Sequence, residues 1–505
     1  MNIPTAFLIF FISNLILAHC ENILIIQSYG YYSHTKVQHS LFLDLLQHGH
    51  NLTIFTPRIM DFSGYENITQ YHFKEHYLDS NDSTIDEILK FIIINGGWFF
   101  LNNLAYVYQV LKTDMKMLEF KKLFLEPENH KFDLIMLETD LYICEILAEI
   151  YDCPVVKFSA CEMVIFQHEM IGNLVHPSIH TSIFMLPRIH GNLSFFDRIL
   201  SFLLYILKYF YSFVLEFFVN DILQDSLPSE LRYPRGYKIS YKRLQMRFTF
   251  LNLMTESIRP IIPSYHQIGF YHIEPPKSLD IELENFINTS INGVILLSIG
   301  SELSLTEIHQ QIFLNAFKKL QFDIIWKVDP EKVKKFEIPK NVLTSNWLPV
   351  SDILGHLNVK ALITHGGART IEEAIDREIP MIFIPMVCDQ QFNVKFLTKK
   401  GVGISLDINE ISEKSVINAA DEIMKYIYKK NVRKYKEYVY DQMMTSHEIA
   451  RENIKVLLKH KDVYSYQQYE GRRIGFITRY FIDIYLILSL FIFIFYYLRK
   501  FLGNL

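Results

Sequence analysis

The sequence is poor in cysteine and has no excess of either charge. Five cysteines occur among its 505 residues, and none of them forms a Cys-x-x-Cys pair. Nothing supports a cysteine-based metal cage, and we interpret the cysteines beyond position 20 as buried free thiols, with a disulfide in an oxidising compartment as the alternative. Lysine and arginine number 50 against 55 acidic residues, which gives a net charge of −5. This balance provides no general attraction to nucleic acid.

The N-terminal region also lacks lysine and arginine, but it is apolar. The run from Ala6 to Leu17 is too short to span a bilayer comfortably, and small residues occupy the last and third-last positions before Glu21. This pattern predicts that residues 1–20 form a secretory signal peptide.

A longer apolar run lies near the C-terminus, from Tyr480 to Leu498, with Asp483 as its only charged residue. A helix of this length covers the roughly 30 Å hydrocarbon core of a membrane. We predict a transmembrane helix over residues 480–498 and a cytosolic tail over 499–505, because Arg499 and Lys500 follow at once. A buried core helix is the alternative. Glycosylation triplets fit a luminal body; they begin at Asn51, Asn67, Asn81, Asn192 and Asn288.

Residues 195–219 form another apolar, aromatic stretch, but it contains Asp197, Arg198, Lys208 and Glu216. These charges argue against a second span. The sequence leaves two alternatives open, a helix on the bilayer surface and a buried helix.

The rest of the chain alternates between strand and helix patterns, and its length suggests two domains. A strand at Asn22–Gln27 is followed by a helix over about 36–47 and a strand at Leu52–Phe55. The alternation recurs from Phe132 to Phe158 and resumes at Gly293 after a proline-bearing segment. We predict doubly wound α/β domains. The expected boundaries are 21–270 for the first domain, 271–290 for the linker and 291–460 for the second domain.

The segment from Val359 to Asn393 carries the strongest chemical signal. An apolar strand ends at Thr364, glycines follow at 366 and 367, and a helix pattern begins at Ala368. This geometry presents free backbone N–H groups and the positive end of a helix to an anion. Glu372 and Glu373 could accept hydrogen bonds from sugar hydroxyls. A diphosphate joined to sugars on both sides would suit this arrangement.

The string Thr364-His365-Gly366-Gly367, Glu373-Ala374, Pro380, Pro385 and Asp389-Gln390 resembles, at matching spacing, the signature of the UDP-glycosyltransferases, the family that contains the UDP-glucuronosyltransferases. The overall pattern is similar to invertebrate members. The resemblance implies two facing Rossmann-like domains of the GT-B type and a C-terminal transmembrane helix. It also implies a single-pass type I protein of the endoplasmic reticulum, with the body in the lumen and a role in detoxification.

The resemblance further implies which residues bind the donor. Ser301 follows a strand in the turn that contacts the diphosphate, and Trp347 stacks on uracil, with a core position as its alternative. The expected donor-binding residues are Ser301, Trp347, Thr364, His365, Gly366, Gly367, Glu373, Asp389 and Gln390.

The expected base is His34, in the loop after the first strand, because histidine exchanges protons near neutral pH. An ordinary polar loop residue is the alternative reading. The family orients its base with a carboxylate at the end of a later strand, which matches Glu138; Asp140 is the competitor. A carboxylate there would fix the tautomer of the imidazole.

The sequence lacks the Asp-x-Asp motif of metal-dependent transferases. Its best approximation, Asp79-Ser-Asn-Asp82, lies in a polar loop and is discounted. We therefore expect no cofactor and no metal, with the UDP-sugar as co-substrate.

The leading hypothesis is inverting transfer of glucuronate or glucose from UDP-glucuronate or UDP-glucose to a hydroxyl of a small lipophilic acceptor. The protein would be membrane-bound, and a homo-oligomer is one assembly that it could adopt. Val350, Arg369 and Glu378 depart from the family pattern, where Gln, Asn and Gly are common. They support an alternative, a weakened member that binds nucleotide sugar or lipophile without efficient turnover. A UDP-sugar epimerase is a third reading, against which the signal and the anchor argue.

Overall fold

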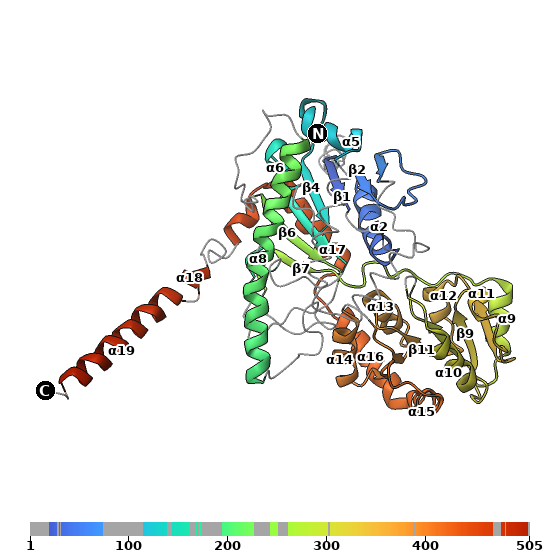
Figure 1. Ribbon diagram of the computed structural model, residues 1–505. Helices are drawn as coiled ribbons and strands as arrows, with labels where there is room; N and C mark the ends of the chain where they lie inside the picture. Colours follow the sequence, from blue (N-terminus) through green and yellow to red (C-terminus); the bar gives the residue numbers. More distant parts are fainter. Residues whose placement is uncertain are drawn as a thin grey trace, which may run out of the picture.

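Figure 1 shows two α/β bodies, each built on its own sheet, and a long helix that projects at the C-terminal end. Several predictions lie outside the residues that the structure describes: the signal peptide before Cys20, residues 79–82, Asn81, Asp140, Asn192 and Ser301. The computed structural model describes residues 20–27, 30, 32–73, 115–138, 144–160, 168, 171–173, 194–226, 243–250, 261–300, 303–386, 389–467, 476–479 and 481–502.

The first sheet has seven parallel strands in the order β3-β2-β1-β4-β5-β6-β7. Its central strands are mostly apolar, because both faces of the sheet are covered and every residue of β4 and β5 is buried. The strands are β1 Asn22–Ile26, β2 Asn51–Thr56, β3 Ile68–His72, β4 Leu134–Glu138, β5 Val155–Ser159, β6 Leu244–Thr249 and β7 Tyr265–Gln267.

Helix α2 (Tyr32–Gln47) connects β1 to β2, and the predicted stripe of Val37, Leu41 and Leu45 is buried. The helix begins one turn earlier than predicted, so His34 lies in its first turn and not in a loop. The other helices of this part of the chain are α5 Leu118–Leu125, η2 Pro127–Asn129, α6 Glu145–Ile150 and α8 Phe195–Ser226.

The second sheet has six parallel strands in the order β10-β9-β8-β11-β12-β13. Alternate residues of its central strand face two separate cores, Leu296 one and Leu297 the other. The strands are β8 Val294–Ser298, β9 Asp323–Lys327, β10 Val342–Ser345, β11 Val359–Thr364, β12 Met381–Phe383 and β13 Gly403–Ser405. The helices are α9 Ile281–Thr289, α10 Glu307–Phe317, α11 Pro330–Val333, α12 Val350–Leu354, α13 Ala368–Asp376, α14 Gln390–Lys399, α15 Glu413–Ile423 and α16 Tyr426–Tyr440.

The chain crosses between the two bodies twice, and the crossings touch. The first crossing passes Phe270, which packs in the second core, and Tyr271, which packs in the first. The second leads from α16 to α17 (Ser446–Lys459). The rings of Phe270 and Tyr440 lie 5.6 Å apart, and Ser446 Oγ donates a 2.6 Å hydrogen bond to the carbonyl of Gly269.

Helix α17 packs on the first sheet, where Ala450, Ile454 and Leu457 join the core. The predicted range 291–460 thus ends in a helix that belongs with the first sheet by its packing. The predicted linker, 271–290, contains α9, which packs on the second core through Leu283 and Ile287.

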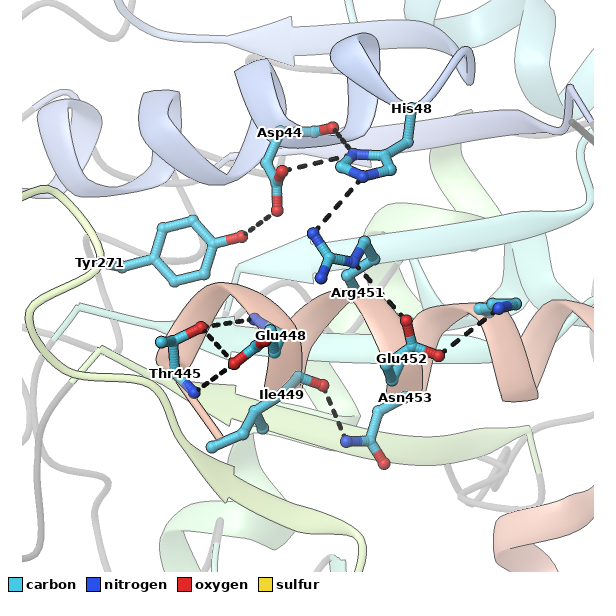
Figure 2. Close-up of polar contacts among 10 residues, drawn as sticks. Asp44, His48, Tyr271, Thr445, Glu448, Ile449, Arg451, Glu452 and Asn453 are labelled. Atoms are coloured by element: carbon cyan, nitrogen blue, oxygen red, sulfur yellow. Dashed lines mark hydrogen bonds and ion pairs between the residues drawn. The ribbon is translucent and has the colours of Figure 1, made fainter. Parts of the chain in front are cut away.

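Polar contacts link α17, the first crossing and the C-terminal half of α2 (Figure 2). The Tyr271 hydroxyl donates to Asp44 Oδ2 at 2.7 Å, and the ring of His447 stacks on Tyr271 at 3.9 Å. Burial and the neighbouring carboxylate of Asp44 raise the pKa of Tyr271, so this hydroxyl stays a donor. A capping box between Thr445 and Glu448 begins α17.

After η4 (Val463–Gln467) and α18 (Phe476–Arg479), the chain ends in α19 (Ile482–Leu502). It is long and apolar enough to cross a membrane, with a mean hydropathy of 1.9 over its most apolar part. No residue of that part is buried. Asp483 lies in its first turn, and Arg499 and Lys500 lie in its last. It starts and ends a few residues later than the predicted 480–498.

Helix α8 has two different sides. Ser201, Tyr205 and Ile222 are buried, and Ile222 packs in the first core. The exposed apolar side chains of its first half are Phe195, Phe196, Ile199, Leu200, Phe202, Leu203, Ile206 and Leu207.

Candidate active site

The strand order reverses once in each sheet, between β1 and β4 in the first and between β8 and β11 in the second. Ligands of doubly wound sheets bind outside the carboxyl ends of the strands at such points. His34 follows β1, Glu138 ends β4, Gly300 follows β8 and His365 follows β11. The predicted base and the predicted diphosphate loop therefore lie at the two positions where the fold favours a ligand.

His34 is held by a buried carboxylate. Its Nδ1 lies 3.2 Å from Glu138 Oε1, and Gln38 Nε2 donates a 2.6 Å hydrogen bond to the same oxygen. Glu138 is 1% exposed, and Gln38 also contacts Gln27. A proton on Nδ1 that bonds this carboxylate leaves Nε2 as the nitrogen that can accept a proton.

The N-terminus of α13 faces the ligand position without a side-chain cap. Gly367 is its N-cap, and no side chain bonds the first amides. Gly366 has φ +85, which only glycine adopts readily, and a Cβ at Gly367 would lie 2.5 Å from His365 Nε2. The start of α13 thus has no side-chain cap, which is compatible with the predicted anion site.

His365 packs between the two loops at the reversal point. A Cβ at Gly300 would lie 3.1 Å from its ring, and the hydroxyl of Thr364 lies 3.3 Å from its Nδ1. Burial, followed by the charges of Arg369 and Lys327, lowers the pKa of His365 to about 4. The ring is therefore neutral at pH 7. Thr364 is fully buried, so its hydroxyl contacts His365 and does not face solvent.

The start of α14 closes the site beside this turn. Asp389 Oδ2 accepts a 2.8 Å hydrogen bond from Asn393 Nδ2, which also bonds the carbonyl of Gly366 at 3.2 Å. Burial raises the pKa of Asp389, while Asn393 and the nearby His34 lower it. The charge of the predicted base in the first domain is thus among the influences on this predicted sugar contact of the second. Gln390 is buried, and its side chain accepts from the Met386 amide.

Glu373 lies between two cationic side chains, Lys36 and Arg369, and the imidazole of His272, whose pKa is lowered by burial well below its ordinary value. Its Oε1 is 3.7 Å from Lys36 Nζ, 3.8 Å from His272 Nε2 and 4.0 Å from Arg369 Nε. The residue is 3% exposed, and no hydrogen bond to its side chain joins it to another described residue. The carboxylate therefore keeps its acceptor capacity for a ligand.

Glu372 does not share the role that the sequence suggested. Its Oε2 accepts a 3.0 Å hydrogen bond from the Phe270 amide and lies 3.6 Å from His272 Nδ1. Burial raises its pKa well above the ordinary value, the neighbouring Glu373 adds to this, and the Phe270 amide opposes it. Glu372 thus faces the first crossing and not the ligand position.

Trp347 is 56% exposed, so a core position is excluded. Lys327 Nζ lies 4.6 Å from its ring centroid, and Tyr32 meets it edge-on at 5.2 Å. Val350, where the family has a polar residue, packs partly buried against the second core. The aromatic face that could hold a base is present, while the expected polar neighbour is an apolar packing residue.

Arg369 is a basic residue of the site whose place the sequence left open. Its guanidinium lies 5.2 Å from the ring centroid of Tyr32, and its Nε and Nη1 are buried without a hydrogen-bond partner. Asn393 was missed altogether, because nothing in its local pattern separates it from an ordinary helix residue. Among the predicted glycosylation sites, Asn51 and Asn288 are exposed and Asn67 is half-buried.

The fold and this site define a glycosyltransferase of the GT-B type. Solved structures with this fold include the glycotransferase of kitacinnamycin, with a TM-score of 0.60, 15% identity and coverage of 87% of this chain and 100% of that one. A UDP-glucosyltransferase from Polygonum tinctorium has a TM-score of 0.58, 13% identity and coverage of 87% and 99%. These identities show the fold alone.

The family model described as UDP-glucoronosyl and UDP-glucosyl transferase matches residues 23–467, and the chain belongs to this family. UDP-glucuronosyltransferase 2B15 of Homo sapiens is 26% identical over 452 residues, which are 85% of this chain and 83% of the relative. UDP-glycosyltransferase UGT4 of Dactylopius coccus is 27% identical over 468 residues, which are 87% of this chain and 86% of the relative. The chain is therefore a UDP-glycosyltransferase that transfers a sugar from a UDP-sugar to an acceptor.

Proposed function

We propose that this enzyme is anchored in the membrane and transfers glucuronate or glucose to a hydroxyl of a small lipophilic acceptor by one inverting displacement. The observation that carries the proposal is the placement of His34. It contacts buried Glu138 in the first domain, and Tyr32 of the same helical turn contacts Trp347 and Arg369 of the second. The relatives do not favour the alternative of binding without turnover.

In the proposed reaction, Nε2 of His34 takes the proton of the acceptor hydroxyl. The acceptor oxygen attacks the anomeric carbon and forms the new C–O bond, while the bond from that carbon to the diphosphate oxygen breaks. UDP leaves with the bonding electrons. The imidazolium formed on His34 is stabilised by the carboxylate of Glu138, 3.2 Å from Nδ1.

The departing diphosphate is stabilised without a metal. The uncapped amides at the start of α13 and the guanidinium of Arg369, whose Nε and Nη1 make no hydrogen bond, supply hydrogen bonds and positive charge. Ser301, His365, Gly366 and Gly367 complete this half of the proposed site. Trp347 offers a ring face to uracil, Glu373 accepts from hydroxyls, and Asp389 with Gln390 bonds the sugar.

We place the body in the lumen of the endoplasmic reticulum, held by α19 as a single type I span. A lipophilic acceptor partitions into the bilayer, so an enzyme tethered beside it meets a concentrated substrate. The exposed apolar side of α8 supports the bilayer-surface alternative over the buried one for residues 195–219.

The test compares microsomes that carry wild type, His34→Ala and the control His39→Ala, a histidine of the same helix that bonds the Asp61 carbonyl. Each is given labelled UDP-glucose or UDP-glucuronate with a phenolic acceptor, with and without EDTA. We expect His34→Ala to lose about 10²–10⁴-fold in turnover and to keep UDP binding, with no effect of EDTA. Conjugation by His34→Ala at the wild-type rate would refute the assignment.

A further inference from the structure

The first turn of α2 touches the second domain on both sides of His34. Tyr32 contacts Trp347 and Arg369, and Lys36 contacts Glu373. Tyr32 and Lys36 are four residues apart, so they lie on the same face of the helix. His34 lies between them in sequence and is turned toward Glu138 of its own sheet. The first turn of α2 therefore carries the proposed base, His34, on one side. On another side, Tyr32 and Lys36 contact the donor-binding domain.

The contact of Tyr32 is aromatic and cationic. Its ring meets Trp347 edge-on, with 5.2 Å between the centroids and an interplanar angle of 89°. Arg369 of the second domain and Arg58 of the first lie 5.2 and 5.7 Å from the centroid of Tyr32. Edge-on aromatic pairs and cation–π contacts are both attractive at these distances. Tyr32 thus lies among groups from both domains.

The contact of Lys36 is an ion pair with a buried partner. Its Nζ lies 3.7 Å from Glu373 Oε1, and the side chains are 37% and 3% exposed. The carboxylate is on α13, whose first turn is the proposed diphosphate site. The ion pair of Lys36 therefore connects α2, which carries the proposed base, to α13, whose N-terminus is the proposed diphosphate site.

We propose that Tyr32 and Lys36 are positioning residues that set the register of α2 against the donor-binding domain. This inference rests on the proposed function of His34. Tyr32 and Lys36 act through His34, which is aligned with the anomeric carbon when their contacts are made. Loss of these contacts leaves the donor residues of the second domain in place but displaces the base. Turnover at saturating donor falls, while UDP affinity is preserved.

The experiment uses the full chain in membranes, with Tyr32→Leu, Lys36→Met and the double variant. Two conservative variants serve as the comparison: Tyr32→Phe keeps the aromatic ring, and Lys36→Arg keeps the positive charge. Controls are Tyr438→Leu, a tyrosine that contacts Lys434, and Lys318→Met, a lysine 3.6 Å from Glu337. We expect the double variant to lower kcat about tenfold or more, with less than about threefold change in the Kd of UDP. The conservative variants retain most of kcat.

Amide exchange of residues 32–40 supplies a readout that does not depend on catalysis. It accelerates in the double variant and stays at the wild-type rate in both controls. The inference is overturned if kcat of the double variant is unchanged, if the conservative variants lose as much as the disruptive ones, or if exchange does not change. Accelerated exchange together with a wild-type rate for His34→Ala would instead refute the role of His34 and leave the contact between the domains standing.

Discussion

The orientation of His34 depends on the carboxylate of Glu138. Glu138 Oε1 has Nδ1 of His34 at 3.2 Å and the amide of Gln38 at 2.6 Å, on a residue that ends a fully buried strand. The buried carboxylate, contacted by His34 and bonded by Gln38, restrains the imidazole through its Nδ1. This is the arrangement that a base requires if its second nitrogen is to meet an acceptor hydroxyl.

We expect Glu138→Gln to lower kcat by about 10²-fold or more, because an amide at this position cannot hold the imidazole as a carboxylate does or stabilise its cation. UDP affinity should stay within about threefold, since the donor residues are on the other domain. Steady-state kinetics and UDP titration check this, with the exposed Glu128→Gln as the matched control. A kcat within twofold of wild type would contradict the role given to Glu138.

The three departures from the family pattern have different structural places. Glu378 has φ +57, a left-handed conformation that explains why glycine is common there, and its carboxylate accepts a 2.9 Å hydrogen bond from Arg433. Val350 packs against the second core. Only Arg369 faces the site, where its free N–H groups add donors.

The sequence predicted that the candidate residues after the strands lie together, because parallel strands bring their carboxyl ends to one edge, and the structure places His34, Glu138, Gly300 and His365 at these strand ends. The local pattern alone offered both Glu372 and Glu373, which are adjacent and chemically identical, and only the family resemblance selected Glu373. The difference comes from the first crossing, whose Phe270 amide bonds Glu372 and not Glu373. Contacts between segments about a hundred residues apart leave no local pattern to detect.

Among the elements, the central strands were predictable from their apolar runs. The start of α2 was not, because Tyr32-Ser33-His34 shows no helical periodicity. The sequence pattern of α17 predicted a helix but not the core that it packs against, because an apolar helix face can pack against either sheet. Its place on the first sheet depends on Ala450, Ile454 and Leu457 fitting between α2 and β6 residues.

Helix α8 is expected to contact the bilayer independently of α19. With a protease site inserted after Gln467, cleaved protein should still float with phosphatidylcholine vesicles. The triple substitution Phe202→Ser, Leu203→Ser and Ile206→Ser should weaken this binding at least about tenfold, because each apolar side chain contributes up to about 2 kcal/mol on burial. Ile308→Ser, which removes an exposed isoleucine of the second domain, is the control. Release of the cleaved wild type would show that α8 stays in water.

At the scale of the whole molecule, several buried histidines make stability depend on pH. Burial lowers the pKa of His266 to about 4. The unfolded chain takes up a proton near pH 6.5 and the folded chain only near 4, so stability is lost as pH falls below about 6.5. Glu372, with its raised pKa, acts in the opposite sense.

We therefore expect His266→Gln to lose less stability than wild type when the pH is lowered from 7.5 to 5.5, by about 1 kcal/mol. Thermal unfolding of detergent-solubilised protein at both pH values measures the difference. His39→Gln, an exchange on the outer part of α2, should follow wild type. If His266→Gln lost as much folding stability as wild type, or more, between pH 7.5 and 5.5, the expected direction of this effect would be contradicted.

The meeting of the two crossings has a mechanical consequence. Asp44, near the C-terminal end of α2, is bonded to Tyr271 beside the crossings, while Tyr32 begins the helix twelve residues away. At 1.5 Å per residue, Tyr32 lies about 18 Å along α2 from Asp44, so a rotation of α2 about its contact with Tyr271 acts over that length. A rotation of about 10° there would swing the tip by about 3 Å, the difference between a proton in reach and one out of reach.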